Sequence, residues 1–111
     1  MTIGEWLESR TPRPPAPLMA SLTGALGPAA NSDASEAAAV FLATAEQMLR
    51  KLVASGETGR EIAQDLLTID ALTTYALESA TETLQTLSGF SDDAMARFAG
   101  LAEPGDPPAA T

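Results

Sequence analysis

A chain of 111 residues with no histidine and no cysteine lacks the side chains behind the commonest catalytic and metal-binding chemistry. Histidine is the usual general base and cysteine the usual thiolate nucleophile, so zinc sites, redox pairs and serine–histidine triads are excluded or strongly disfavoured. Fifteen acidic against six basic side chains give a net charge of −9, and this charge disfavours nucleic-acid and membrane-surface partners because it repels their phosphates.

The length is that of one small domain. No segment approaches the ~20 consecutive apolar residues of a membrane-spanning helix, and the first ten residues lack the basic start of a secretory signal. The absence of cysteine suits a reducing compartment. We therefore expect a single cytoplasmic helical domain over residues 1–102, followed by a proline-rich, disordered tail over residues 103–111.

The first predicted element is a short helix over residues 2–9. Thr2 and Glu5 stand at the spacing of a capping box, in which each side chain bonds the other residue's backbone amide. The apolar residues that follow, including Trp6, recur at helical spacing. A helix of about two turns is marginal alone, so Trp6 needs a surface to cover it.

A proline-rich arm over residues 11–14 follows, and it leaves two interpretations of the opening segment. In the first, Trp6 anchors the segment in the groove of a partner protein. The possible partner-binding residues are then Trp6, Leu7, Arg10 and Arg13. In the second, which we favour, Trp6 folds back onto its own chain, because so large an aromatic side chain is costly to leave in water.

Two further helices are predicted over residues 15–26 and 33–55. Gly27 and Pro28 end the first of them, and Gly56 ends the second. The apolar face of the 33–55 helix is predicted to hold Ala38, Phe41, Leu42, Ala45, Met48, Leu49, Leu52 and Val53. The turn after Gly56 is only two or three residues long, so the next helix must run back antiparallel to this one.

That next helix is predicted over residues 59–88, and Ser88–Gly89 is expected to end it. Its apolar face would hold Ile62, Ala63, Leu66, Ile69, Thr73, Ala76, Leu77, Ala80, Leu84 and Leu87, and its polar face Arg60, Glu61, Gln64, Tyr75, Glu78 and Glu82. A last helix is predicted over residues 91–102, with Ser91 as its cap. The expected fold class is all-α: a small bundle built on a central antiparallel helical hairpin, crossed by helices 15–26 and 91–102.

Asp70 is the most informative polar residue of the hairpin, because it projects into the predicted apolar arc. A buried lone carboxylate is costly, so we expect it to pair with Arg13 or Arg97, or to cap the end of a neighbouring helix. Two alternatives remain. Asp70 could line a pocket with Thr73 and Thr74, or the helical phase could be shifted so that Asp70 lies at the rim.

The acidic residues Glu61, Asp65, Glu78 and Glu82 invite comparison with carboxylate-bridged metal sites in helical bundles. Such sites also use histidine on inward-facing positions. This chain has none, and most of these acids project outward, which favours a solvated acidic face. We predict no metal site, no cofactor and no catalytic residue.

Two stretches carry a resemblance: WLESRTPRPPAPL at residues 6–18 and DLLTIDALTTYA at residues 65–76. In them the chain resembles a class of small, functionally uncharacterised bacterial helical proteins with a WLxxRTPxPP-type opening. The resemblance covers about a third of the chain. It implies a helical fold and brings no activity, ligand or site.

Two classes of function follow. The one we predict is a non-enzymatic interaction or accessory protein that binds a protein partner or self-associates through apolar helical surface. A homodimer that buries the overhanging half of the 59–88 helix is one form of it. The alternative is a small-molecule-binding helical protein or minor enzyme with a pocket near Asp70, Thr73 and Thr74.

Overall fold

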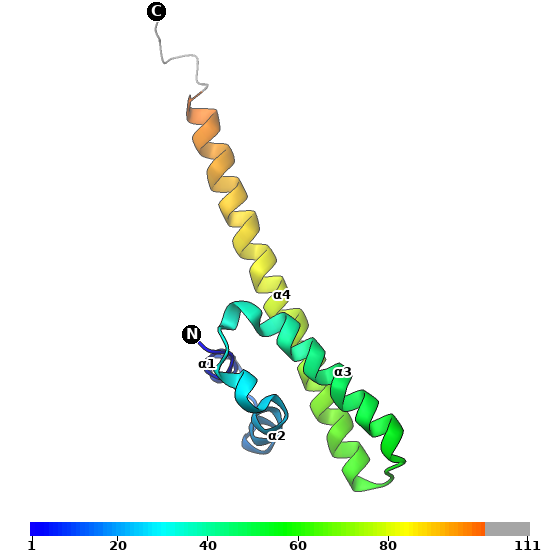
Figure 1. Ribbon diagram of the computed structural model, residues 1–111. Helices are drawn as coiled ribbons and strands as arrows, with labels where there is room; N and C mark the ends of the chain where they lie inside the picture. The colour runs from blue at the N-terminus through cyan, green and yellow to red at the C-terminus, as the bar shows by residue number, and fades with distance from the viewer. Residues whose placement is uncertain (102–111) are drawn as a thin grey trace, which may run out of the picture. The chain divides into compact units, whose positions relative to one another are not determined.

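The computed structural model describes residues 1–101, and the described chain is helical almost throughout (Figure 1). Its elements are α1 (Ile3–Glu8), α2 (Ala16–Leu26), the 3-10 helices η1 (Gly27–Asn31) and η2 (Ala34–Glu36), α3 (Ala37–Ser55) and α4 (Arg60–Leu101). The predicted all-α class is confirmed, with α3 packed against α4 and the short N-terminal helices beside them. The tail expected over residues 103–111 lies outside the described residues.

The chain divides into two compact units, Met1–Ala80 and Thr81–Thr111. Helix α4 contributes residues to both. The first unit contains the predicted hairpin, in which α3 and the first part of α4 run antiparallel (Figure 1). Gly56 and Gly59 make this turn at φ +67° and +83°, a backbone conformation that glycine adopts without steric cost. Gly56 therefore ends α3 as predicted.

Helix α1 begins with the predicted capping box. The Thr2 amide donates to Glu5 Oε1 at 2.8 Å, and the Glu5 amide donates to Thr2 Oγ1 at 3.1 Å. The hydrogen bond from the Thr2 amide, and to a lesser extent the Thr2 side chain, favours the ionised carboxylate and lowers the pKa of Glu5. Backbone bonds from Ile3 N to Ser32 O and from Ala34 N to Met1 O, both 2.9 Å, then hold α1 against the segment that precedes α3.

An aromatic cluster forms the centre of the first unit. The rings of Trp6, Phe41 and Tyr75 meet at centroid distances of 5.5 Å, 6.1 Å and 6.4 Å. Around them the core contains Ile3, Leu7, Leu22, Leu26, Ala37, Ala45, Leu72 and Ala76. Tyr75 is half-buried against the other two rings, so its predicted place on the polar face is wrong. Burial raises its pKa, and the nearby Glu78 carboxylate raises it further.

The buried faces of the hairpin are narrower than predicted. On α3, Phe41, Ala45 and Leu52 are buried as expected, but Leu42, Leu49 and Val53 are exposed. On α4, the buried residues are Thr68, Leu72, Ala76 and Ser79. Small residues allow close approach at this contact, and the Thr68 hydroxyl bonds the Gln64 carbonyl at 3.1 Å, which removes the cost of burying it. The contact face of α4 is therefore rotated from the predicted arc.

The predicted break at Ser88–Gly89 and the separate helix over residues 91–102 are both wrong. Helix α4 continues to Leu101, the last described residue. Gly89 is not among the glycines with positive φ, so it does not act as a C-terminal cap. A glycine inside a helix costs only about 1 kcal/mol, and no proline stands nearby to remove a backbone donor. Along this part of α4, the side chains of Met95, Phe98 and Leu101 are exposed.

Candidate interaction surfaces

Of the four residues predicted to bind a partner, Trp6 and Leu7 are buried, Arg10 is half-buried and Arg13 is exposed. Trp6 and Leu7 are only 5% and 1% exposed, so the interpretation in which Trp6 folds back onto its own chain is confirmed. Arg10 stacks over the Trp6 ring, with Cζ 3.7 Å from the ring centroid, and its Nε donates to the Trp6 carbonyl at 3.2 Å. Arg10 Nη1 also lies 3.9 Å from the Glu78 carboxylate, whereas Arg13 is exposed beside Glu8.

The predicted pocket residues Asp70, Thr73 and Thr74 are all exposed. The expectation of a buried carboxylate at Asp70 is therefore wrong, and the shifted helical phase is the alternative that holds. Thr73 donates its hydroxyl to the Ile69 carbonyl at 2.9 Å. The three side chains do not enclose a polar cavity, although Thr73 borders an apolar groove described below.

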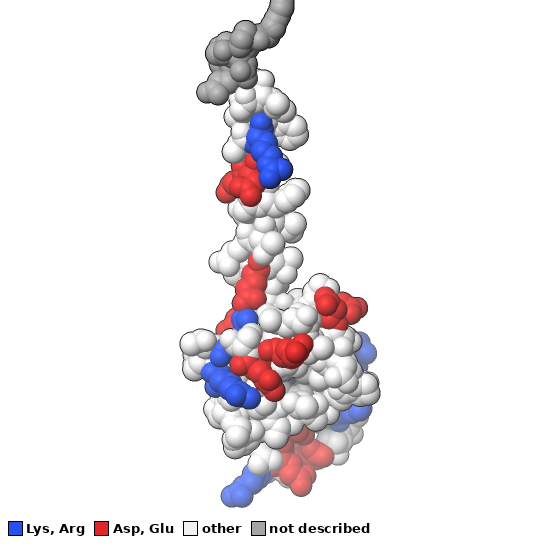
Figure 2. Space-filling model, turned by 90° about the vertical axis from the view of Figure 1, so that its left-hand side faces the viewer, with Lys and Arg blue, Asp and Glu red and all other residues white. Residues whose placement is uncertain are grey.

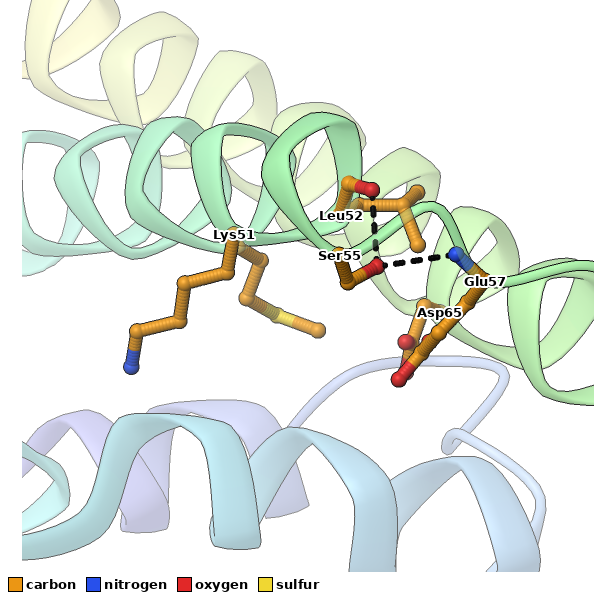
Figure 3. Close-up of a pocket in the computed structure, with 6 residues that line it drawn as sticks. Lys51, Leu52, Ser55, Glu57 and Asp65 are labelled. Atoms are coloured by element: carbon orange, nitrogen blue, oxygen red, sulfur yellow. Dashed lines mark hydrogen bonds between the residues drawn. The ribbon is translucent and has the colours of Figure 1, made fainter.

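A hollow of about 250 Å³ lies where α3 ends and α4 begins (Figure 3). Ser55 is its central polar group: its hydroxyl donates to the Leu52 carbonyl at 2.9 Å and accepts from the Glu57 amide at 3.1 Å. Both bonds complete the end of α3, so the hydroxyl serves the backbone. In Figure 3 the Lys51 side chain extends away from the carboxylates of Glu57 and Asp65. This arrangement caps a helix and does not assemble a reactive group.

An apolar groove of about 260 Å³ lies between α3 and α4 in the first unit. It is lined by Ala38, Ala39, Leu42, Thr73, Ala76, Leu77 and Ala80. Leu42 and Leu77 are more than half exposed at its edges. Ala38, Ala76 and Ala80, which the sequence predicts on the apolar faces of the two helices, line this groove.

The second unit carries six exposed large apolar side chains on one helix. We define the α4 stripe as Leu84, Leu87, Phe90, Met95, Phe98 and Leu101, whose side chains are 58% to 79% exposed. A depression of about 400 Å³ on this surface is lined in part by Phe90, Phe98 and Leu101. In the view of Figure 2, the surface of this part of α4 is mostly uncharged, with few acidic and basic groups.

Sequence reasoning placed Leu84 and Leu87 on the apolar face of the 59–88 helix and the residues beyond Gly89 in a separate helix over residues 91–102. It assumed a break at Gly89 that would fold residues 91–102 back onto the hairpin. The signal that could have corrected this is the unbroken three-and-four spacing of apolar or small residues from Leu84 to Leu101. A spacing that passes through Gly89 without a change of phase indicates one helix.

Within residues 1–101, no group of three or more acidic, histidine or cysteine side chains could hold a metal ion. In the same described part, no helix is long and apolar enough to cross a membrane. No family model, no curated protein and no solved structure matches this chain.

Proposed function

We propose that this protein is a non-enzymatic interaction protein that binds another polypeptide chain through the α4 stripe. The observation that carries the proposal is the exposure of six large apolar side chains along one side of one helix. Exposed apolar patches of this kind are typical of protein–protein contacts. An amphipathic helix that presents its apolar side is also a recurring recognition element. We place this activity in the cytoplasm, which suits a chain without cysteine.

Burial of the stripe would supply a useful binding energy. Complete burial of a leucine, phenylalanine or methionine side chain contributes about 1.5–3 kcal/mol, and these six side chains are each more than half exposed. Only the surplus over the cost of association appears as affinity. Six such side chains therefore supply a favourable contribution of the same order as that cost.

A small-molecule pocket has less support. The apolar groove between α3 and α4 has a volume of about 260 Å³, below the roughly 300–1,000 Å³ of typical ligand sites. Its one polar lining residue, Thr73, already donates its hydroxyl to a backbone carbonyl. Specific ligand sites usually add a few convergent polar groups to an apolar lining.

The proposal is tested by site-specific photo-crosslinking of the full chain in cells. A photoreactive phenylalanine analogue replaces Leu87 in the stripe or, as the matched control, Gln85 on the opposite side of the same turn. We expect a protein adduct from position 87 that is absent or much weaker from position 85. No protein adduct from position 87, or equal adducts from both positions, would refute the proposal.

A further inference from the structure

The α4 stripe follows the register of a coiled coil. Within residues 84–101, apolar or small residues alternate at spacings of three and four without interruption. In heptad notation, the a positions are Leu84, Ser91 and Phe98, and the d positions are Leu87, Ala94 and Leu101. A seam of this kind is the surface that one helix presents to another in a coiled coil. Ser91 is the polar residue among these a and d positions.

The two exposed residues of the stripe outside the a and d positions indicate the direction of the partner helix. Phe90 lies at a g position and Met95 at the e position five residues later. In a parallel, in-register pair, a g residue lies beside the e residue five positions along the other chain. Phe90 of each copy would therefore cover Met95 of the other, on both sides of the seam.

The charge pattern allows an identical copy to dock here. The acids of residues 81–101 are Glu82, Asp92 and Asp93, at the outer positions f, b and c. None stands at the a, d, e or g positions that meet a partner, where Arg97 is the only charge. Coiled coils choose unlike partners through charges at e and g. Because this seam is largely uncharged, charges at the e and g positions do not disfavour pairing with a second copy.

The available area is of the size that a dimer needs. A stable interface buries about 800 Å² on each partner. Phe90 and Phe98, 73% and 67% exposed, together supply roughly 300 Å² of it, since a phenylalanine buries ~150–250 Å². The three leucines and Met95 supply the larger remaining share.

We infer that the α4 stripe is covered by a second copy of this chain, packed parallel and in register as a two-stranded coiled coil over residues 84–101. The inference rests on the proposed function, because it names the partner that the stripe binds. In such a pair, the exposed apolar side chains of the stripe would pack against those of the second copy.

Sedimentation equilibrium of the full chain measures the assembly directly. We expect a mass of twice 11.4 kDa at micromolar concentration. Leu87→Glu places a charge in the seam and should raise the dissociation constant by about tenfold or more. Gln85→Glu adds the same charge at an outer position and should leave it unchanged. The inference would be overturned if the unmodified protein had the mass of one chain or of three chains. It would also be overturned if both variants raised the dissociation constant equally.

Two further measurements show whether the variants fold normally and determine the relative orientation of the two helices. The fluorescence of Trp6, which is buried in the first unit, should be the same in both variants if that unit folds normally.

The chain has no cysteine, so Ser91→Cys introduces a single thiol. In a parallel, in-register pair, the two thiols come within disulfide distance, about 4.4–6.8 Å between Cα atoms. We expect oxidation to link most Ser91→Cys chains but few Asp92→Cys chains, and a dimer without this preference excludes the parallel register.

Failure of this inference is distinguishable from failure of the proposed function. If the crosslinked adduct from position 87 contains a different protein and the chain is monomeric in solution, the proposed function stands and self-association is wrong. If position 87 gives no protein adduct and the chain is monomeric, both are wrong. An adduct with the mass of two chains supports both.

Discussion

Trp6 joins elements that are far apart in the sequence. Its ring contacts Phe41 of α3 and Tyr75 of α4, and the Arg10 guanidinium stacks over it. The two-turn helix α1 would be marginal alone, so these contacts account for its place in the fold. The residue that looked most suited to anchoring a partner is therefore a structural centre of the first unit.

Replacement of Trp6 by alanine should lower the free energy of unfolding by about 3–5 kcal/mol, the usual cost of removing a large buried aromatic side chain. Urea unfolding followed by circular dichroism measures this change. Leu42→Ala, at an exposed position of α3, is the control and should cost less than about 1 kcal/mol. A loss below about 1 kcal/mol for Trp6→Ala would contradict the placement of Trp6 in the core.

Asp70 provides the contrasting case, in which a substitution should leave the free energy of unfolding almost unchanged. Because its carboxylate is exposed, Asp70→Asn should change the free energy of unfolding by no more than about 0.5 kcal/mol in either direction. A buried ion pair at this position would instead cost about 3–5 kcal/mol when one partner is removed. Chemical denaturation of the two proteins at neutral pH decides between these outcomes.

Glu5 should make the stability of the protein depend on acid pH. Its hydrogen bonds to Thr2 lower its pKa in the folded state below the usual 4.5. A group with a lowered folded pKa contributes stability above its unfolded pKa, and this contribution is lost as the pH falls through the folded value. We expect the stability difference between the native chain and Glu5→Gln to favour the native chain at pH 7 and to shrink below pH ~4. A difference that grows on acidification would contradict this linkage.

At the level of elements, the sequence predicts the features that depend on short-range signals. The Thr2–Glu5 capping box, the stop at Gly56 and the antiparallel hairpin each depend on a few neighbouring residues, and all are found. The phase of α4 was missed because two apolar arcs overlap on this helix. The arc that includes Leu72 and Ala76 packs against the core, and the one that includes Leu66 and Leu77 is largely exposed. Tertiary contacts choose between such arcs, and helical periodicity alone does not.

The part of the candidate surface beyond Gly89 was missed for a related reason. Ser88–Gly89 has the composition of a helix end, but glycine ends a helix reliably only where a left-handed conformation or a following proline completes the stop. Neither applies at Gly89. The apolar residues beyond it therefore stay on the same helix and form the α4 stripe, where the sequence had predicted a separate packed helix.

Gly89→Ala tests the continuity of α4. Open space surrounds the position that a Cβ atom would occupy, and alanine is favoured over glycine within a helix by about 1 kcal/mol. We expect the substitution to increase helical circular dichroism and to slow amide hydrogen exchange around residue 89. At a left-handed cap the same change would be unfavourable. Faster exchange in the variant would thus indicate a helix end at Ser88–Gly89.

At the scale of the whole molecule, charge and apolar surface act against each other. Each chain carries a net charge of −9, so two copies repel at long range, while the uncharged seam of the α4 stripe attracts at contact. Such repulsion is screened by salt, whereas burial of apolar area is not weakened by it. The balance predicts how association should respond to ionic strength.

Raising the salt concentration from about 0.1 M to about 1 M shortens the screening length from about 10 Å to about 3 Å. We expect the dissociation constant of the self-associated chain to fall over this range, because repulsion between the two acidic copies is screened while the apolar contact persists. Sedimentation at several salt concentrations, with Leu87→Glu as a control that stays largely monomeric, measures the trend. A partner recognised through its basic surface would behave in the opposite way, since salt would weaken the attraction between unlike charges. Association that weakens steadily with salt would therefore identify charge, and not the apolar seam, as its main source.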